Sequence, residues 1–493
     1  MAAAAAAAAA QASATNAGAL YRAIWRWHFY AGLLVLPLLA WLAVTGAGFV
    51  YHRPLDRLVH HQLLVVAPAA PGERPATPQR IVQAALAAQP GQVFRYTTPA
   101  AADASAEVGI VAPDGARRVV YVDPVHARVL GSLADRGTFG WTLRRLHSLD
   151  LLGDWARALV ELAAGWAIVL VLTGVYLWWP RGTVRIPSKR APIPQRGRTL
   201  GGVITVRGRP SQRLFWRDLH AVVGIGAGAA VLFLAMSGMP WSWLWGAQVN
   251  KLVNGHNFGY PAGLRVQLPM SQARVADTAD QAWSLQQARV PQSAAHAAMA
   301  DMPGMEHAGH GAGHASAAQP GAIGLDRAVA AFDARGIGAG YSVSMPQGAR
   351  GVYTASLYNG VLDQQRVIHL DQYSGRTLLD MRYADYGPAA KALEWGINVH
   401  MGDEFGSTNR VLLVLACACT LVLCISAAVM WWKRRPRGGL GVPPLPAQPR
   451  TLKVVAGMLA VGGVLFPLVG VSWLVMLAVD LGWVQPRQRA RRA

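Results

Sequence analysis

Four histidines occupy repeated positions relative to a hydroxyl-bearing residue. In each of four apolar segments a Thr or Ser is followed six residues later by an aromatic residue: Thr45 and Tyr51, Thr173 and Trp179, Ser237 and Trp243, and Ser426 and Trp432. Two histidines, His28 and His220, lie 17 residues before the hydroxyl of their own segment. The other two, His147 and His400, lie 26 residues before theirs. The first and third segments are therefore interpreted as copies of each other, as are the second and fourth.

Glycines extend the repeat and indicate a flat cofactor. They follow two of the histidines by four residues and the other two by six: Gly32, Gly224, Gly153 and Gly406. Two facing neutral imidazoles can supply both axial ligands of a haem iron, and a glycine on the same face lets a macrocycle lie against the backbone. We predict two haems. His28 pairs with His220 around one iron. His147 pairs with His400 around the other, with His52 as an alternative outer ligand.

The chain has apolar runs long enough to hold these histidines in membrane helices. A helix needs about 20 apolar residues to cross the hydrocarbon layer. Uncharged runs of this size lie at 29–50, 162–179, 221–249, 411–432 and 454–479. We expect four core spans and a fifth C-terminal span. Pro467 leaves a helical hairpin open as the alternative for the last run, but we favour a single span.

Charge sets the expected orientation. Residues 181–213 contain nine Lys or Arg and no acid, and basic segments beside spans stay in the cytoplasm. This places the N-terminus in the cytoplasm and residues 51–156 and 250–409 outside. A single fifth span would leave the basic tail at 487–492 outside, against the same rule. Of all residues 14% are charged, the net charge is +21, and the basic residues form no nucleic-acid motif, so we expect no nucleic-acid partner.

The two outside segments share a helix followed by strand-like runs, one helix at 79–89 and the other at 325–335. The expected fold is a mainly α membrane protein of duplicated two-helix units, with two small α+β extracytoplasmic domains. The domain plan is a disordered Ala-rich tail at 1–20, a first span at 21–52, an outside domain at 53–140, a second span with a preceding interfacial helix at 141–180, a basic cytoplasmic loop at 181–213, a third span at 214–249, a second outside domain at 250–398, a fourth span at 399–433, a cytoplasmic loop at 434–452 and a fifth span at 453–484.

A Met- and His-rich segment at 295–320 interrupts the second outside domain. Its candidate metal ligands are Met299, Met302, Met305, His307, His310 and His314. Thioethers suit Cu(I), and imidazoles accept Cu(II), Zn or Ni, so the segment is a possible copper site. A low-complexity segment that binds no metal is an equal alternative.

Several of these stretches together resemble the PepSY-associated transmembrane family, which includes iron-regulated inner-membrane proteins and ferric-siderophore reductases. The matching stretches are 25–32, 146–153, 173–181, 218–224, 400–406 and 431–436. The resemblance implies PepSY domains near 79–131 and 325–379, a bacterial inner-membrane location and, for some members, b-type haem and reduction of ferric chelates in the periplasm. The Met- and His-rich segment is not a general family feature, which leaves a cupric substrate open.

These observations predict a di-haem inner-membrane oxidoreductase, a b-type haem metalloreductase that passes electrons outward to a ferric siderophore or another metal chelate. No G-x-G-x-x-G lies between a strand and a helix, so the electron donor is expected to be a separate cytoplasmic reductase or a quinol. The alternative is a haem-free metal-binding or transport-accessory membrane protein. Other residues are predicted to have structural roles. We interpret Glu161 as an interfacial acid, and Cys417, Cys419 and Cys424 as small core residues.

Overall fold

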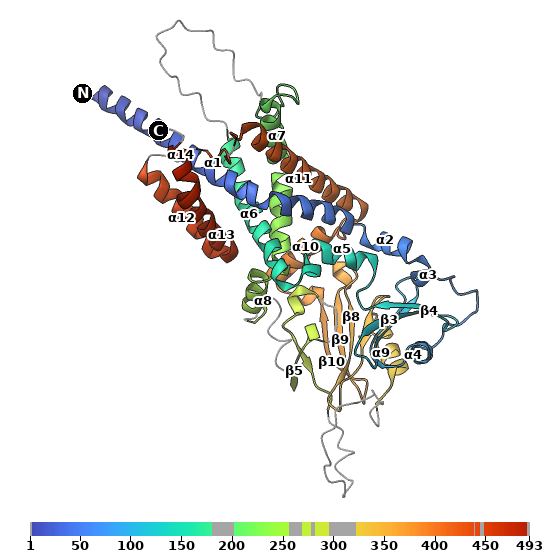
Figure 1. The fold of residues 1–493 in the computed structure, drawn as a ribbon. Helices are drawn as coiled ribbons and strands as arrows, with labels where there is room; N and C mark the ends of the chain where they lie inside the picture. Colours follow the sequence, from blue (N-terminus) through green and yellow to red (C-terminus); the bar gives the residue numbers. More distant parts are fainter. Residues whose placement is uncertain are drawn as a thin grey trace. The chain divides into compact units, whose positions relative to one another are not determined.

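The computed structural model describes residues 2–179, 202–255, 269–277, 282–294, 322–437, 439–443 and 448–490. The chain divides into two compact units (Figure 1). The helical unit comprises Met1–Gly48, Arg145–Ala247 and Val411–Ala493. The sheet unit comprises Phe49–Arg144 and Gln248–Arg410. The Met- and His-rich segment and most of the basic loop lie outside the described residues.

The helical unit is built from long apolar helices. Its principal helices are α1 (Ala2–Phe49), α6 (Asp154–Trp178), α7 (Arg213–Gly238), α11 (Gly406–Arg434), α12 (Pro449–Leu465) and α13 (Pro467–Val479). Among the described residues, five helical stretches are long and apolar enough to cross a membrane: Gly18–Phe49, Trp155–Trp178, Arg213–Trp241, Gly406–Arg434 and Pro467–Gln488. Large apolar side chains on these helices are exposed, which fits contact with lipid: Leu412, Leu415, Val471 and Leu474 are examples. The expectation of a mainly helical, multi-pass membrane protein is confirmed.

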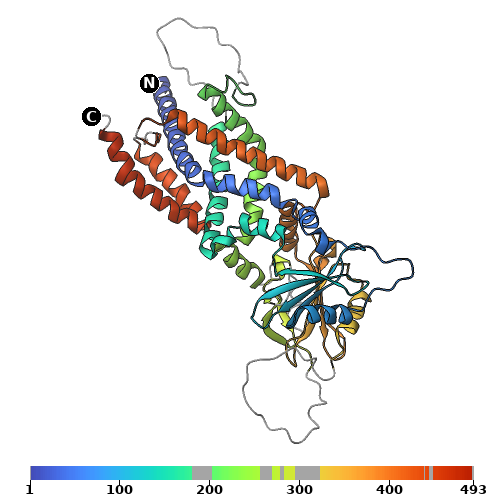
Figure 2. The same ribbon diagram turned by 45° about the vertical axis from the view of Figure 1, so that its right-hand side comes forward.

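The C-terminal apolar run differs from the single span expected at 453–484. Phe466 leaves the helical conformation, with φ −130° and ψ 88°, and Pro467 begins a new helix. Proline favours a first helical turn because it has no N–H to donate. The helices α12 and α13 lie side by side in both views (Figures 1 and 2), and a Cβ added to Gly463 would stand 2.7 Å from Cα of Gly470. The run is therefore a helical hairpin, and the single span is corrected.

The N-terminal segment also differs from expectation. Residues 1–20 were expected to be a disordered tail, but α1 begins at Ala2 and continues through them. Alanine has the highest intrinsic helix propensity, so a run of alanines extends a helix that is already nucleated by the following span.

The sheet unit contains one continuous sheet rather than two separate domains. The strands are β1 (Gln92–Thr97), β2 (Ala106–Val111), β3 (Arg117–Val122), β4 (Val129–Ala134), β5 (Met270–Arg274), β6 (Arg289–Pro291), β7 (Ser342–Ser344), β8 (Val352–Leu357), β9 (Arg366–Asp371) and β10 (Thr377–Arg382). Eight of them form an antiparallel sheet in the order β10-β9-β8-β7-β1-β2-β3-β4, and β5 pairs with β6. The join is the antiparallel pairing of β1 with β7, where Tyr96 lies opposite Val343.

Shorter helices complete this unit. They are α2 (His52–Val59), α3 (His61–Leu64), α4 (Pro78–Ala88), α9 (Leu325–Asp333) and α10 (Pro388–Met401), while α5 (Phe139–His147) and α8 (Trp245–Gly255) cross the boundary between the units. The Thr77 hydroxyl caps α4, and Pro78 occupies its first turn, as helix starts favour. Ile81 of α4 and Phe332 of α9 share one buried core with strand residues of both halves, such as Val120 and Ile368. Merging the halves therefore gives them a single core.

The same turn follows β3 and β9. Asp123 accepts a hydrogen bond from the backbone N–H of Val125 at 2.9 Å, and Asp371 accepts one from Tyr373 at 3.0 Å. Each turn then uses a residue in the left-handed region, with φ of 52° at Ala127 in the first and a glycine in the second. Aspartate favours such turns because its side chain can accept from the backbone two residues on.

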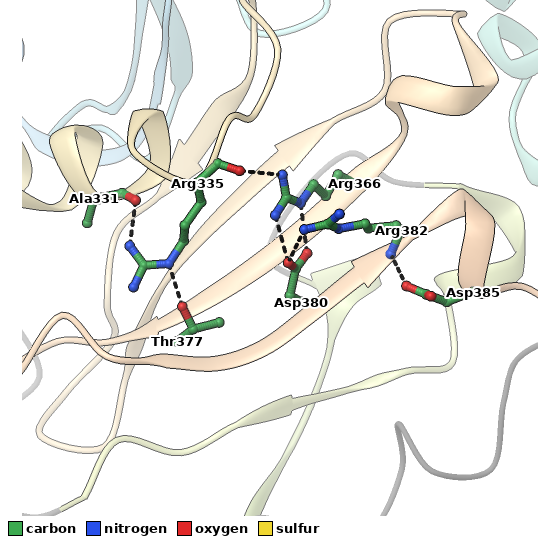
Figure 3. A network of polar contacts seen from close by, with 7 residues as sticks. All are labelled: Ala331, Arg335, Arg366, Thr377, Asp380, Arg382 and Asp385. Carbon is green, nitrogen blue, oxygen red and sulfur yellow. Dashed lines mark hydrogen bonds and ion pairs between the residues drawn. The ribbon is translucent and has the colours of Figure 1, made fainter.

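An arginine cluster holds the edge strand β10 in place (Figure 3). Asp380 accepts hydrogen bonds from Arg366 at 2.7 and 2.8 Å and from Arg382 at 3.2 Å. Arg366 also donates to the carbonyl of Arg335, just after α9, at 2.8 Å. Burial alone would raise the pKa of Asp380, but these guanidinium groups hold it below its ordinary value.

We predict that Asp380→Asn lowers the free energy of opening the sheet edge by about 1–3 kcal/mol at neutral pH, because two arginines lose a charged acceptor. A carboxylate with a lowered pKa stabilises the fold above its unfolded pKa of about 4, and this contribution is lost as the pH falls through its folded pKa. Hydrogen exchange of β9 and β10 in the full-length protein measures the effect. The variant should exchange faster at neutral pH and approach the wild type in acid. Asp363→Asn, at an exposed position in the same unit, is the control. Equal protection of the Asp380 variant and the wild type at neutral pH would refute the prediction.

Candidate functional site

The inner histidines are each held by a hydroxyl from another helix. His28, on α1, has its Nδ1 2.8 Å from Oγ1 of Thr173 on α6. His220, on α7, has its Nδ1 2.9 Å from Oγ of Ser426 on α11. Both imidazoles are half-buried. The hydroxyls that mark the repeat in the sequence are therefore the contact partners of the histidines.

A third histidine makes the same contact. His147 ends α5, and its Nδ1 lies 3.0 Å from Oγ1 of Thr45 on α1. Thr45 thus serves the histidine that precedes α6, while Thr173 of α6 serves His28 of α1. The two helices exchange the same imidazole–hydroxyl contact in both directions.

The inner histidines lie on different helices of the helical unit. His28 is on α1 and His220 is on α7, within range of a through-space electrostatic interaction. The outer pair is divided: His147 belongs to the helical unit, and His400 lies near the end of α10 in the sheet unit. The pairing of His147 with His400 stays a prediction. His52 lies in the sheet unit, where its Nδ1 is 2.9 Å from the carbonyl of Phe49.

Two of the predicted glycines face leucines of the neighbouring helix. A Cβ on Gly32 would lie 3.9 Å from Cδ2 of Leu170, and one on Gly224 would lie 3.6 Å from Cδ2 of Leu423. Both leucines come three residues before the hydroxyl that holds the histidine. These distances are ordinary contacts, so both glycines leave space between helices at matched positions.

The other two predicted glycines have a backbone role. Gly153 precedes α6 with φ 94°, and Gly406 begins α11 with φ 57°. Four residues earlier in each copy, Leu149 and Gly402 also have positive φ, 57° and 84°. Glycine is the residue that adopts these angles without strain. Their spacing from the histidines is explained by a turn that leads into each span.

The glycine after the hydroxyl is a feature that the sequence reasoning missed. A Cβ on Gly46 would lie 3.1 Å from Cε1 of His147, and a Cβ on Gly174 would lie 3.5 Å from Cε1 of His28. The hydroxyl therefore binds the ring nitrogen while the next residue leaves room for the ring. The Thr-Gly pairs at 45–46 and 173–174 were visible in the sequence as the available signal.

Buried charges lie two residues before each inner histidine, and they are of opposite sign. Arg26 is fully buried and pairs with Asp480 at the end of the α12–α13 hairpin. Asp218 is fully buried and pairs with Arg207 at 2.7 Å and Arg217 at 2.6 Å. Ionisable groups within membrane helices are costly unless paired, so both pairs fix helix ends beside the inner histidines.

The remaining predicted residues are an acid, three cysteines and the candidate metal ligands. Glu161 is buried within the protein and accepts hydrogen bonds from the backbone of Leu244 at 2.7 Å and Trp245 at 3.2 Å, at the start of α8. The three cysteines are free thiols on α11, and Cys424 is buried while Cys417 and Cys419 are half-buried. The described residues contain no group of three or more His, Cys, Asp or Glu placed to hold a metal ion. The Met- and His-rich ligand candidates lie outside the described residues.

A family model described as the PepSY-associated TM region matches residues 25–434. The chain belongs to this family. The matched stretch includes the four histidines and their four hydroxyls, whereas the α12–α13 hairpin of this PepSY-associated protein lies beyond it. No curated protein matches the chain.

In this PepSY-associated protein, we predict that alanine is tolerated at position 174 but not at position 46. Alanine favours helix over glycine by about 1 kcal/mol, and the new Cβ of Gly174→Ala makes an ordinary contact with His28. The Cβ of Gly46→Ala approaches His147 to 3.1 Å, so the ring must move. Thermal unfolding of the purified protein should show Gly174→Ala unchanged or more stable and Gly46→Ala less stable. Equal shifts for the two variants would contradict the packing described here.

Proposed function

We propose that the protein is a di-haem membrane oxidoreductase that carries electrons outward to reduce a ferric siderophore or another metal chelate, a cupric chelate included. The observation that carries the proposal is the inner histidine pair. Two half-buried imidazoles from α1 and α7 come within electrostatic range of each other, and each has Nδ1 held by a hydroxyl of a further helix. Bound histidines of metal sites commonly hold their second nitrogen in this way.

The residues at the inner site fit a haem. His28 and His220 would hold the iron, and the half-buried, apolar helices around them suit a porphyrin. Gly32 and Gly224 lie one turn beyond each histidine, and each faces a leucine of a neighbouring helix. A haem supplies reversible one-electron chemistry when bound, while the chain supplies the ligands, their orientation and a site of low polarity. His147 and His400 would serve a second haem in the same way.

The proposed orientation follows the basic residues. The N-terminus and the basic segment at 181–213 face the cytoplasm of a bacterial inner membrane, and the sheet unit faces the periplasm. The hairpin supports this arrangement, because it returns Asp480 to Arg26 near the start of the first candidate span, Gly18–Phe49. The basic residues after Asp480 then also lie on the cytoplasmic side, which removes the conflict that a single fifth span would create.

We further propose that the chain arose by duplication and that the halves of the sheet unit are PepSY domains. The support is the recurrence of features at fixed offsets. Positive φ angles recur before α6 and α11, and an Asp-based turn follows both β3 and β9. Each half of the sheet unit also contributes four strands to the shared sheet and one helix to the shared core.

The electron donor is proposed to be a separate cytoplasmic reductase or a quinol. The basic segment at 181–213 offers positive charge for docking an acidic partner surface. On the periplasmic side, the Met and His side chains at 295–320 would favour copper among the possible metals.

We predict that His220→Ala removes one haem and abolishes electron transfer while membrane insertion is kept. The wild-type protein, purified from haem-replete cells, should bind about two haems per chain, one for each histidine pair, and change its spectrum on reduction with dithionite. His61→Ala, at an exposed histidine outside the repeat, is the matched control and should keep both haems.

Two outcomes would contradict this proposal. A colourless wild-type preparation would favour the haem-free metal-binding or transport-accessory function. An unchanged spectrum and activity in the His220 variant would show that the inner pair is not a ligand pair.

A further inference from the structure

We propose that Thr173, Ser426 and Thr45 are positioning residues that fix the tautomer of their histidines, so that Nδ1 carries the proton and Nε2 presents a lone pair to a metal. The inference rests on the proposed function for the identity of the metal group. The tautomer itself is a property of the chain, and it can be measured without the cofactor.

The single proton of each hydroxyl is already used in a hydrogen bond to its own helix. A hydroxyl has one proton to donate and two lone pairs to accept with. Thr173 donates to the carbonyl of Val169 at 2.7 Å, and Thr45 donates to the carbonyl of Trp41 at 2.7 Å. Ser426 donates to a carbonyl of its own helix at 3.0 Å. Each hydroxyl can then only accept from the imidazole, which requires an N–H at Nδ1.

The tautomer determines which nitrogen of the ring presents a lone pair. A neutral imidazole protonated at Nδ1 has its lone pair at Nε2, on the far side of the ring from the hydroxyl. Donation from Nδ1 also makes Nε2 a stronger ligand and fixes the plane of the ring. The helix that carries the hydroxyl thereby orients a histidine that belongs to another helix.

The fourth hydroxyl of the repeat has its proton used in the same way. Ser237 donates to the carbonyl of Phe233 at 2.7 Å, the distance found for Thr45 and Thr173. The hydroxyl repeat in the sequence is therefore a repeat of acceptors. Thr420 on α11 makes the same bond to its own helix, to Ala416 at 2.8 Å, but does not belong to the repeat.

The experiment compares Thr173→Val, Thr173→Ser and Thr420→Val in the full-length protein. Valine keeps the shape of threonine and removes the acceptor, serine keeps the acceptor, and position 420 controls for loss of a hydroxyl elsewhere. The first readout is the nitrogen chemical shift of histidines labelled with ¹⁵N in haem-free protein. The second is the midpoint potential of the haem in loaded protein. Ser426→Ala provides an independent variant that acts on His220.

We expect His28 to be protonated at Nδ1 in the wild type and in Thr173→Ser, and to lose this preference in Thr173→Val. The Val variant should still bind haem, with a raised midpoint potential, because a weaker imidazole donor stabilises ferric iron less. Thr420→Val should match the wild type in both readouts.

Protonation of His28 at Nε2 in the wild type would overturn the inference. Unchanged shifts and potential in Thr173→Val would also overturn it, even where His220→Ala removes a haem and the proposed function stands. A wild-type protein that binds no haem would overturn the proposed function, while the nitrogen shifts would still decide the tautomer.

Discussion

An imidazole placed among membrane helices needs a polar partner for each of its nitrogens, because a buried polar group without a partner costs roughly 1–3 kcal/mol. Here a hydroxyl from another helix accounts for Nδ1 at 2.8–3.0 Å in three histidines. The hydroxyl is in turn satisfied by its own backbone, so no further polar group has to be buried. This arrangement ties α1 to α6 and α7 to α11, and it leaves Nε2 of each ring for another partner. The helix pairing and the proposed chemistry both depend on it.

Around this common arrangement different ion pairs lie beside His28 and His220. Next to His28, the buried Arg26 is neutralised by Asp480, which the C-terminal hairpin brings back along the bundle. Next to His220, the buried Asp218 is neutralised by Arg207 and Arg217. The hairpin also packs on α6, where Trp166 donates to Ser472 at 2.8 Å. His28 and His220 thus share the same imidazole–hydroxyl contact, while the ion pair with the C-terminal hairpin lies next to His28. That asymmetry gives the two inner histidines unlike electrostatic surroundings, since one has a single neutralising partner nearby and the other has two.

Spacing along the chain predicted the repeats and elements within single segments. It could not predict which segments contact one another. The histidine repeat, the four core spans and the paired helix–strand segments follow from local periodicity. The space beside Gly46 and Gly174 depends on rings from other segments, so a count along the sequence did not identify it. The run at 454–479 is apolar throughout, and proline can either begin or interrupt a helix, so composition could not separate a span from a hairpin. The joining of β1 to β7 depends on strands far apart in the chain, whose alternating patterns specify strands but not their neighbours. At the polyalanine start, low complexity indicates disorder, whereas the helix propensity of alanine favours the helix that begins at Ala2.

The axial ligation of the iron in the purified full-length protein tests the central claim most directly. Low-temperature electron paramagnetic resonance and near-infrared magnetic circular dichroism of the oxidised protein distinguish two imidazole ligands from other ligand pairs. We predict a bis-imidazole signal from both haems, and we expect the same part of it to be lost when either His28 or His220 is replaced by alanine, because each supplies one side of the same iron. A signal with a different axial pair, or one that keeps its full intensity after either substitution, would contradict this proposal.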